Sequence, residues 1–351
     1  MRPVSFVAAR DVRHALTELS GGTDGTGTKF IAGGTNIIDL MKENVMSPRK
    51  LVDINGLAMS RVEESADGGV VLGALARNAD TAYHPLIRTH YPLLSAAILA
   101  GASAQIRNMA TNGGNLLQRT RCWYFYDTVT PCNKREPGSG CSALGGLTRY
   151  HAILGASENC VATNPSDMCV ALAALDATVH VESASGTREI AFKDFHRLPE
   201  DRPELDSNLT PDELITHIGL PDARRFAKHS TYLKVRDRAS YAFALVSVAA
   251  MLDLADNGTV REARVALGGV AHKPWRLPEA EALLTDKPPV AENFGLLADA
   301  LLSGARGLGL NDFKIPLAHR AIVRALEMAR DGTLSNTGIQ PDSFDQKENA
   351  S

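Results

Sequence analysis

The chain has 351 residues, of which 44% are hydrophobic and 22% charged, with a formal net charge of −3 at pH 7. This length predicts two or three domains with cores of their own. The small net charge and the absence of a long basic run give no support to nucleic-acid binding, and no apolar stretch is long enough to predict a membrane span.

The first twenty residues carry scattered charges, among them Arg2, Arg10, Asp11 and Arg13. A secretory signal needs an uninterrupted apolar core, which this segment lacks. The sequence therefore predicts no export signal of its own.

The N-terminal third alternates predicted strands and helices around a loop with two glycines. A buried strand is expected at 28–31 and runs into Ala32-Gly33-Gly34-Thr35-Asn36, which we call the first glycine loop. Apolar runs bounded by turn residues predict further strands at 50–54 and 70–75. Helical spacing of apolar residues predicts helices at 35–44 and 91–104.

A second glycine loop, Ala110-Thr111-Asn112-Gly113-Gly114-Asn115, follows these elements. Glycines let backbone N–H groups converge on a diphosphate because no Cβ blocks the ligand. One such loop is weak evidence, since most Gly-Gly pairs are ordinary turns, but two in one domain favour a diphosphate cradle. Neither loop fits the Rossmann or P-loop pattern, so a Rossmann nicotinamide site and P-loop hydrolysis are unsupported.

An insert of about residues 119–162 contains four of the five cysteines, namely Cys122, Cys132, Cys141 and Cys160. Its stretch 121–146 is rich in glycine and proline and has no periodicity, so we expect an irregular loop ordered by cysteine ligation. The spacing C-x9-C-x8-C-x18-C lacks the close pair of zinc sites and the C-x2-C-x2-C run of ferredoxins. It leaves open a metal or iron–sulfur centre, redox-active or disulfide-bonded thiols, and unrelated cysteines. The histidines, including His151 and His272, show no metal-ligand spacing, and surface or core roles are expected for them.

The second half predicts an α+β domain with a small antiparallel sheet and helices on one face. A helix capped by Asn164 is expected at 165–175, with Cys169 buried in it, and a strand at 178–183. The proline-rich and acidic stretch 196–212 predicts a linker, and the residues after Arg330 predict a mobile polar tail. Strands are then expected at 230–236, 244–254 and 260–270, and helices at 278–284, 291–303 and 316–329.

Several motifs in this order resemble the FAD-binding medium subunit of xanthine oxidase-type molybdenum hydroxylases. They are the run 30–36, Leu51-Val52-Asp53-Ile54-Asn55, the run 110–116, Pro165-Ser166-Asp167 and Tyr232-Leu233-Lys234-Val235-Arg236. They cover nearly the whole chain. The cysteine insert resembles that of the FAD subunit of bacterial periplasmic aldehyde oxidoreductases, where it holds a [4Fe–4S] cluster.

The resemblance implies a PCMH-type FAD-binding domain of two α/β subdomains at 1–195, a CO-dehydrogenase-flavoprotein-like domain at 212–330 and a tail at 331–351. It implies that the cysteines named above hold the cluster and that the following residues hold a non-covalent FAD: Lys29, Phe30, Ile31, Ala32, Gly33, Gly34, Thr35, Asn36, Ile37, Ala74, Thr111, Gly114, Asn115, Leu117, Asp167 and Lys234. Asp167 would bind the sugar-like part and Lys234 would lie near the flavin. Apart from the resemblance, Asp167 fits an ordinary helix-start acid and Lys234 a solvated strand-edge lysine. No catalytic residue is implied.

The resemblance further implies an electron-transfer subunit of a heterotrimer. A large partner would oxidise an aldehyde at a molybdenum cofactor, and [2Fe–2S] clusters on a small partner would pass electrons to FAD and an external acceptor. The related subunits are exported folded with a small subunit that bears a twin-arginine signal, which implies a periplasmic location; otherwise the chain stays in the cytoplasm. A free-standing flavin oxidoreductase and a zinc-bearing structural subunit remain as alternatives.

Overall fold

The computed structural model describes residues 2–20 and 27–335. At one end of the molecule lies a small parallel sheet in the order β1-β3-β2. Its strands are β1 (Ser5–Ala8), β3 (Lys50–Asp53) and β2 (Thr28–Ile31), accompanied by α1 (Val12–Ser20) and α2 (Ile37–Lys42). Ala15, Leu16 and Val52 are buried in its core, so the strand and helix periodicities converge on one interior.

A second, antiparallel sheet has the order β4-β5-β8-β6-β7. Its strands are β4 (Val62–Glu64), β5 (Val70–Gly73), β8 (Leu214–Leu220), β6 (Thr178–Ser183) and β7 (Gly186–Ala191). Its helices are α3 (Asn78–Tyr83), α4 (Pro85–His90), α5 (Pro92–Ala100), α6 (Ala104–Arg107), α7 (Asn112–Leu116), α9 (Asp167–Ala174) and α10 (Phe192–Phe195). Every residue of α5 from Leu93 to Ala100 is buried, as expected for a helix covered on all sides.

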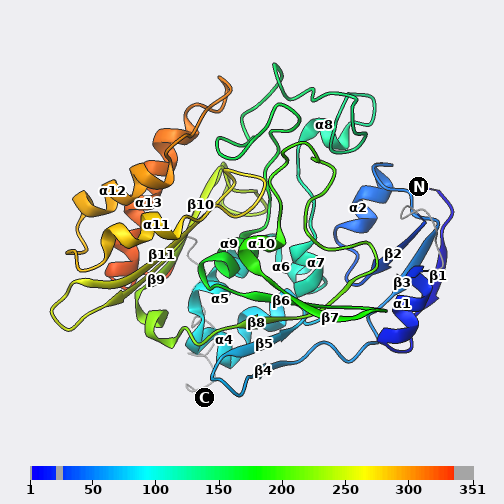
Figure 1. Ribbon diagram of the computed structural model, residues 1–351, viewed down its shortest axis with the longest axis horizontal. Helices are drawn as coiled ribbons and strands as arrows, with labels where there is room; N and C mark the ends of the chain where they lie inside the picture. The colour runs from blue at the N-terminus through cyan, green and yellow to red at the C-terminus, as the bar shows by residue number, and fades with distance from the viewer. Residues whose placement is uncertain (1, 21–26, 336–351) are drawn as a thin grey trace, which may run out of the picture.

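The C-terminal domain contains a third sheet, antiparallel, in the order β11-β10-β9. Its elements are η1 (Arg224–His229), β9 (Ser230–Val235), β10 (Val246–Leu254), β11 (Val260–Gly268), α11 (Pro278–Glu281), η2 (Ala282–Leu284), α12 (Ala291–Leu301) and α13 (Lys314–Arg330). Helices α12 and α13 share a buried core with one face of this sheet, and Figure 1 shows α5 and α9 between its other face and the five-stranded sheet. The expected mixed architecture is confirmed.

The cysteine insert (residues 119–162) contains one helical turn, α8 (Trp123–Tyr126), and is otherwise built of turns, as predicted. Figure 1 shows its loops above the five-stranded sheet, between the C-terminal domain and α2. Polar side chains order its turns: Arg135 donates to the carbonyl oxygens of Tyr124 and Phe125, and the Asn133 side-chain oxygen accepts from the amides of Gly138 and Gly140. Part of the ordering is therefore intrinsic to the loop and does not depend on the cysteines.

Three expectations from the sequence need correction. Ser166, not Asn164, caps α9, because its hydroxyl accepts from the amide of Cys169 while Asn164 accepts from the amide of Ser166. Strand β8 lies beyond the predicted linker, in the range assigned to the C-terminal domain, yet it pairs with β5 and β6 of the FAD-domain sheet. The first residues of the predicted mobile tail are bonded to β9, since the amide of Tyr232 donates to Leu334; residues 336–351 lie outside the described part.

No helix in the described ranges 2–20 and 27–335 is long and apolar enough to cross a membrane.

Candidate functional site

The two glycine loops lie against each other. A Cβ on Gly33 would come within 1.9 Å of the carbonyl oxygen of Met109, which directly precedes the second loop, so only glycine fits there. Gly34 has a φ of +74°, in the left-handed region that favours glycine. The backbone conformation therefore requires glycine at position 33 and favours it at position 34.

The first glycine loop presents free backbone donors. Within the described chain, no oxygen accepts a hydrogen bond from the amides of residues 33–37, five in succession. The side-chain oxygen of Asn36 is also buried and has no donor in the same part of the structure. Converging unpaired N–H groups are what a diphosphate requires. Residues 29–37, all predicted to hold FAD, are half-buried apart from the exposed Thr35, so a ligand can reach the loop.

A partly buried lysine lies beside this loop. Burial, together with the positive charge of nearby Arg119, lowers the pKa of Lys29. Two cations held close together are stabilised when an anion lies near them. This local charge fits the diphosphate of FAD.

The second glycine loop uses its polar groups internally. The Thr111 hydroxyl accepts from the Gly114 amide, and the amide of Gly113 donates to Ala74 at 2.8 Å. The Asn115 side chain bonds to Asn78 at 2.7 Å and to Ser166 at 2.6 Å. The second loop therefore acts as a scaffold that braces the first, and a direct role for its predicted residues in holding FAD stays a prediction.

The remaining predicted contacts lie on both sides of the loops. Leu117 is 41% exposed, and its carbonyl oxygen accepts from the Asn36 side chain at 3.3 Å, whereas Ala74 is buried. Asp167 and Lys234 bond to each other at 2.7 Å, with side-chain exposures of 9% and 1%. Tyr232 also donates to Asp167 at 2.7 Å. The structure brings this acid and base together as a buried ion pair.

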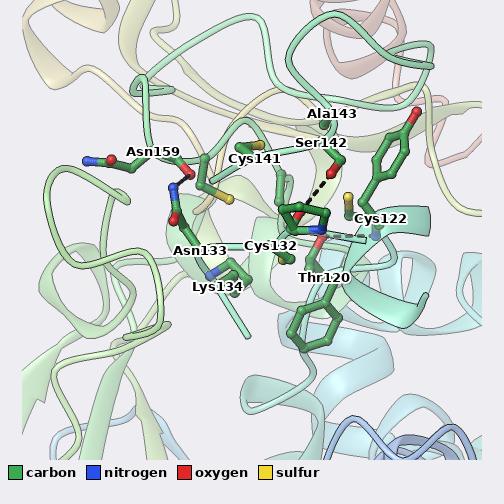
Figure 2. Close-up of a pocket in the computed structure, with 14 residues that line it drawn as sticks. Thr120, Cys122, Cys132, Asn133, Lys134, Cys141, Ser142, Ala143 and Asn159 are labelled. Atoms are coloured by element: carbon green, nitrogen blue, oxygen red, sulfur yellow. Dashed lines mark hydrogen bonds between the residues drawn. The ribbon is translucent and has the colours of Figure 1, made fainter. Parts of the chain in front are cut away.

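The four cysteines of the insert line one pocket, although up to 38 positions separate them along the chain. Figure 2 shows Cys122, Cys132 and Cys141 around it, and Cys160 also lines it. The backbones of Cys132 and Cys141 pair in an isolated antiparallel β-bridge, and all the cysteines are free thiols. The fifth, Cys169, is buried in α9, as predicted.

Two thiols of this cysteine pocket, those of Cys122 and Cys160, are not tuned as nucleophiles. Burial raises the pKa of Cys122 to about 12 and that of Cys160 to about 11, whereas reactive cysteines have lowered pKa values. Such thiols lose their protons when a metal displaces them. In the described ranges no three His, Cys, Asp or Glu side chains are grouped closely enough to hold one metal ion. A cluster differs, because each thiolate binds a separate iron and the sulfurs lie farther apart.

Buried cations and imidazoles surround the pocket. Lys134 is 3% exposed and bonds to Asp206 at 2.6 Å, while Lys314 is fully buried and donates to the carbonyl oxygen of His151 at 2.8 Å. The His151 and His272 rings each contact a cysteine sulfur. Lys134 lines the pocket beside the thiols, and its positive charge suits an anionic centre, whereas burial lowers the pKa of Lys314 to about 7. Sequence reasoning did not single out Lys134 or Lys314, and it expected only surface or core roles for His151 and His272; the one available signal was that His151 is the single histidine of the insert.

The cysteine pocket is packed against the helix that follows the first glycine loop. Leu40 of α2, Phe125 and Cys132 form one buried cluster. Arg121, next to Cys122, bonds to Asp39 of α2 at 2.6 Å. Helix α2 therefore connects the first glycine loop with the cysteine pocket.

Comparisons with known proteins agree with this geometry. The model of the FAD binding domain in molybdopterin dehydrogenase matches residues 2–223, and that of the CO dehydrogenase flavoprotein C-terminal domain matches residues 231–327. The aldehyde oxidoreductase FAD-binding subunit PaoB of Escherichia coli (strain K12) is 51% identical over 305 residues, covering 87% of this chain and 92% of that protein.

Solved structures share the fold. The reconstituted CO dehydrogenase from Oligotropha carboxidovorans aligns with a TM-score of 0.73 at 20% identity, over 94% of this chain and 99% of that one. Quinoline 2-oxidoreductase from Pseudomonas putida 86 aligns with a TM-score of 0.70 at 21% identity, over 95% and 99%. The family expected from the motifs is confirmed. From these matches, the chain belongs to the FAD-binding subunits of the molybdenum hydroxylases, in which an FAD-binding domain is followed by a CO-dehydrogenase-flavoprotein C-terminal domain.

Proposed function

We propose that this chain is the FAD- and [4Fe–4S]-binding electron-transfer subunit of a molybdenum-dependent aldehyde oxidoreductase. The aldehyde reaction is supported by the 51% identity to an aldehyde oxidoreductase FAD-binding subunit. The observation that carries the cluster is the single pocket lined by Cys122, Cys132, Cys141 and Cys160. Zinc fits less well, because the described residues include no group suited to a single ion.

The chain's own residues hold and orient the cofactors in this proposal. The free amides of residues 33–37 bind the FAD diphosphate, with Lys29 offsetting its charge. When bound, FAD exchanges electrons singly with iron–sulfur centres and in pairs with an external acceptor. The four thiols hold the cluster in the pocket packed against α2, and Lys134, which also lines this pocket, offsets its negative charge.

The partners in this proposal are a large subunit with the molybdenum cofactor, where the aldehyde is oxidised, and a small subunit with [2Fe–2S] clusters. We place the heterotrimer in the periplasm, exported with the signal of the small subunit. Fractionation of cells that express all three subunits tests this location: activity in the cytoplasmic fraction alone would exclude it.

An anaerobic assay of iron, acid-labile sulfide and flavin tests the proposal, using the chain co-expressed with its partners. We expect about four irons and one FAD per chain. Cys132→Ala should lose iron and keep flavin, whereas Cys169→Ala, which removes a buried thiol outside the pocket, should keep both. Zinc in place of iron would favour a structural metal. Flavin without any metal would favour a free-standing flavin oxidoreductase.

A further inference from the structure

Two histidines approach the sulfurs of two of the four cysteines in the pocket. The Nε2 atom of His151 lies 3.1 Å from the sulfur of Cys122, and the Nε2 atom of His272 lies 3.2 Å from the sulfur of Cys160. Both histidines are buried, with 2% and 8% of their surface exposed. His151 belongs to the insert, whereas His272 follows β11 in the C-terminal domain. Two different domains therefore deliver imidazoles to one pocket.

The surroundings of each ring decide where its proton lies. The Nδ1 atoms of His151 and His272 are both buried and have no partner within the described chain. A proton on Nδ1 would leave a buried donor unpaired and would direct the lone pair of Nε2 at a thiolate sulfur. A proton on Nε2 instead gives an N–H···S hydrogen bond and leaves only an unpaired acceptor, which is the smaller cost. With the cysteines as thiolate ligands, the tautomer protonated on Nε2 is therefore the one that makes both rings donors to sulfur.

The backbone around both rings is fixed by hydrogen bonds from other segments. The carbonyl oxygen of His151 accepts from Lys314, the first residue of α13, at 2.8 Å and from Asn311, which precedes α13, at 3.1 Å. Beside His272, the carbonyl oxygen of Ala271 accepts from the amide of Asn164 at 2.9 Å. These bonds join the insert, and the segment that follows it, to the C-terminal domain and fix the backbone beside both rings.

We propose that His151 and His272 are positioning residues that donate Nε2–H hydrogen bonds to Cys122 and Cys160 and thereby raise the reduction potential of the [4Fe–4S] cluster. The inference rests on the proposed cluster. Hydrogen bonds to the sulfurs are among the factors that set cluster potentials, because they stabilise the more negative, reduced state more than the oxidised one. The cluster potential in this chain is thus set partly by the C-terminal domain.

The test compares variants that remove the donor with variants that keep one. His151→Leu and His272→Leu lose the N–H group, whereas His151→Gln and His272→Gln offer an amide N–H at a similar reach. His229→Leu is the control, because this ring bonds to the carbonyl oxygens of Ala329 and Arg330 and not to a cysteine. The full chain is isolated anaerobically, its iron and sulfide are measured, and the cluster is titrated redoxometrically with EPR detection.

Each Leu variant should keep four irons. Its reduced-to-oxidised ratio at a fixed potential should fall about tenfold, which corresponds to a cluster potential about 59 mV more negative. The Gln variants and the control should stay near the wild type. Leu variants that keep iron at an unchanged potential would overturn the proposal.

Loss of iron in the Leu variants alone, with iron retained in the Gln variants, supports the need for a donor. Loss of iron in both the Leu and the Gln variants would assign the rings a packing role and overturn the proposal. A wild-type chain without iron refutes the cluster itself, which is a distinct result.

Discussion

The carboxylate of Asp39 accepts a hydrogen bond from the guanidinium of Arg121 at 2.6 Å, and this contact joins α2, the helix that follows the first glycine loop, to the cysteine insert. Asp39 lies in the first turn of α2, directly after the free amides, and Arg121 directly precedes Cys122. The Tyr126 hydroxyl donates to the same carboxylate oxygen at 3.0 Å. A movement of the insert would therefore be transmitted to the helix that follows the first glycine loop.

Asp39→Asn should weaken FAD binding while leaving the iron content unchanged. The pair is about one-third exposed, with 39% and 29% of the two side chains accessible, so solvent screening limits its contribution to about 1 kcal/mol. That corresponds to about a fivefold increase in the FAD dissociation constant, measured by quenching of flavin fluorescence. Asp80→Asn is the control, because Asp80 occupies the same position in the first turn of α3. Equal effects of both variants would point to helix electrostatics and against the bridge.

Gly33→Ala should abolish flavin binding. The new methyl group would overlap the carbonyl oxygen of Met109, so the first glycine loop would have to move away from the second. The moved amides of residues 33–37 could no longer converge on a diphosphate, and the purified variant should show no flavin absorption near 450 nm.

The matched control is Gly295→Ala in α12, where an added Cβ meets nothing within 4 Å. This variant should retain FAD and gain about 0.5–1 kcal/mol of stability from the higher helix propensity of alanine. A Gly33→Ala chain that still contains stoichiometric flavin would show that the first glycine loop is not the cradle.

The buried pair of Asp167 and Lys234 should support the fold whether or not FAD is present. Asp167→Asn removes the carboxylate partner of the buried ammonium group of Lys234, which also donates to the carbonyl oxygen of Ala100 at 3.0 Å. We expect a loss of about 3 kcal/mol in the free energy of unfolding, measured with urea on the flavin-free and the flavin-loaded chain.

The control for this variant is Asp299→Asn, since the Asp299 side chain is 73% exposed and its loss should have little effect. A loss confined to the flavin-loaded chain would instead assign Asp167 to cofactor binding, as the family resemblance implies.

Local patterns in the sequence were sufficient for the elements with strong periodicity. The strands at 28–31 and 178–183 have the predicted bounds, and in the second the alternating Val179 and Val181 are the buried residues. Strand β8 was not anticipated, since it follows a proline-rich loop and takes its place in the sheet only through pairing with β5 and β6. The cap of α9 was placed two residues too early, because Asn164 and Ser166 both suit that position and only the fold distinguishes them.

In the candidate sites, too, features set by neighbouring residues could be predicted, whereas contacts between distant residues could not. Gly33 and Gly34 were recognisable because the close approach and the positive φ both require glycine. The spacing of the cysteines gave no geometry, and the contact of His272 with Cys160 spans 112 positions. Such a contact depends on how the C-terminal domain packs against the insert, which no local pattern encodes.

A charged network at the edge of the five-stranded sheet should make stability depend on pH. The Glu213 side chain is 5% exposed, bonds to Arg188 at 2.8 Å and accepts from the amide of Thr210 at 2.7 Å. The hydrogen bonds from Arg188 lower the pKa of Glu213 below its usual 4.5. Because the folded chain favours the ionised form, this stabilisation is complete above about pH 4.5 and is lost as the pH falls through the lowered pKa.

Glu213→Gln should therefore reduce the free energy of unfolding by about 1–2 kcal/mol at pH 7, a value limited by the 44% exposure of the Arg188 side chain. The difference from wild type should shrink in urea titrations performed at successively lower pH below 4.5. Glu189→Gln, which changes a 70% exposed side chain on the same sheet, should show little effect at any pH. A Glu213→Gln deficit that stays constant down to pH 3 would mean that shape, and not the charge of the carboxylate, is what this position contributes.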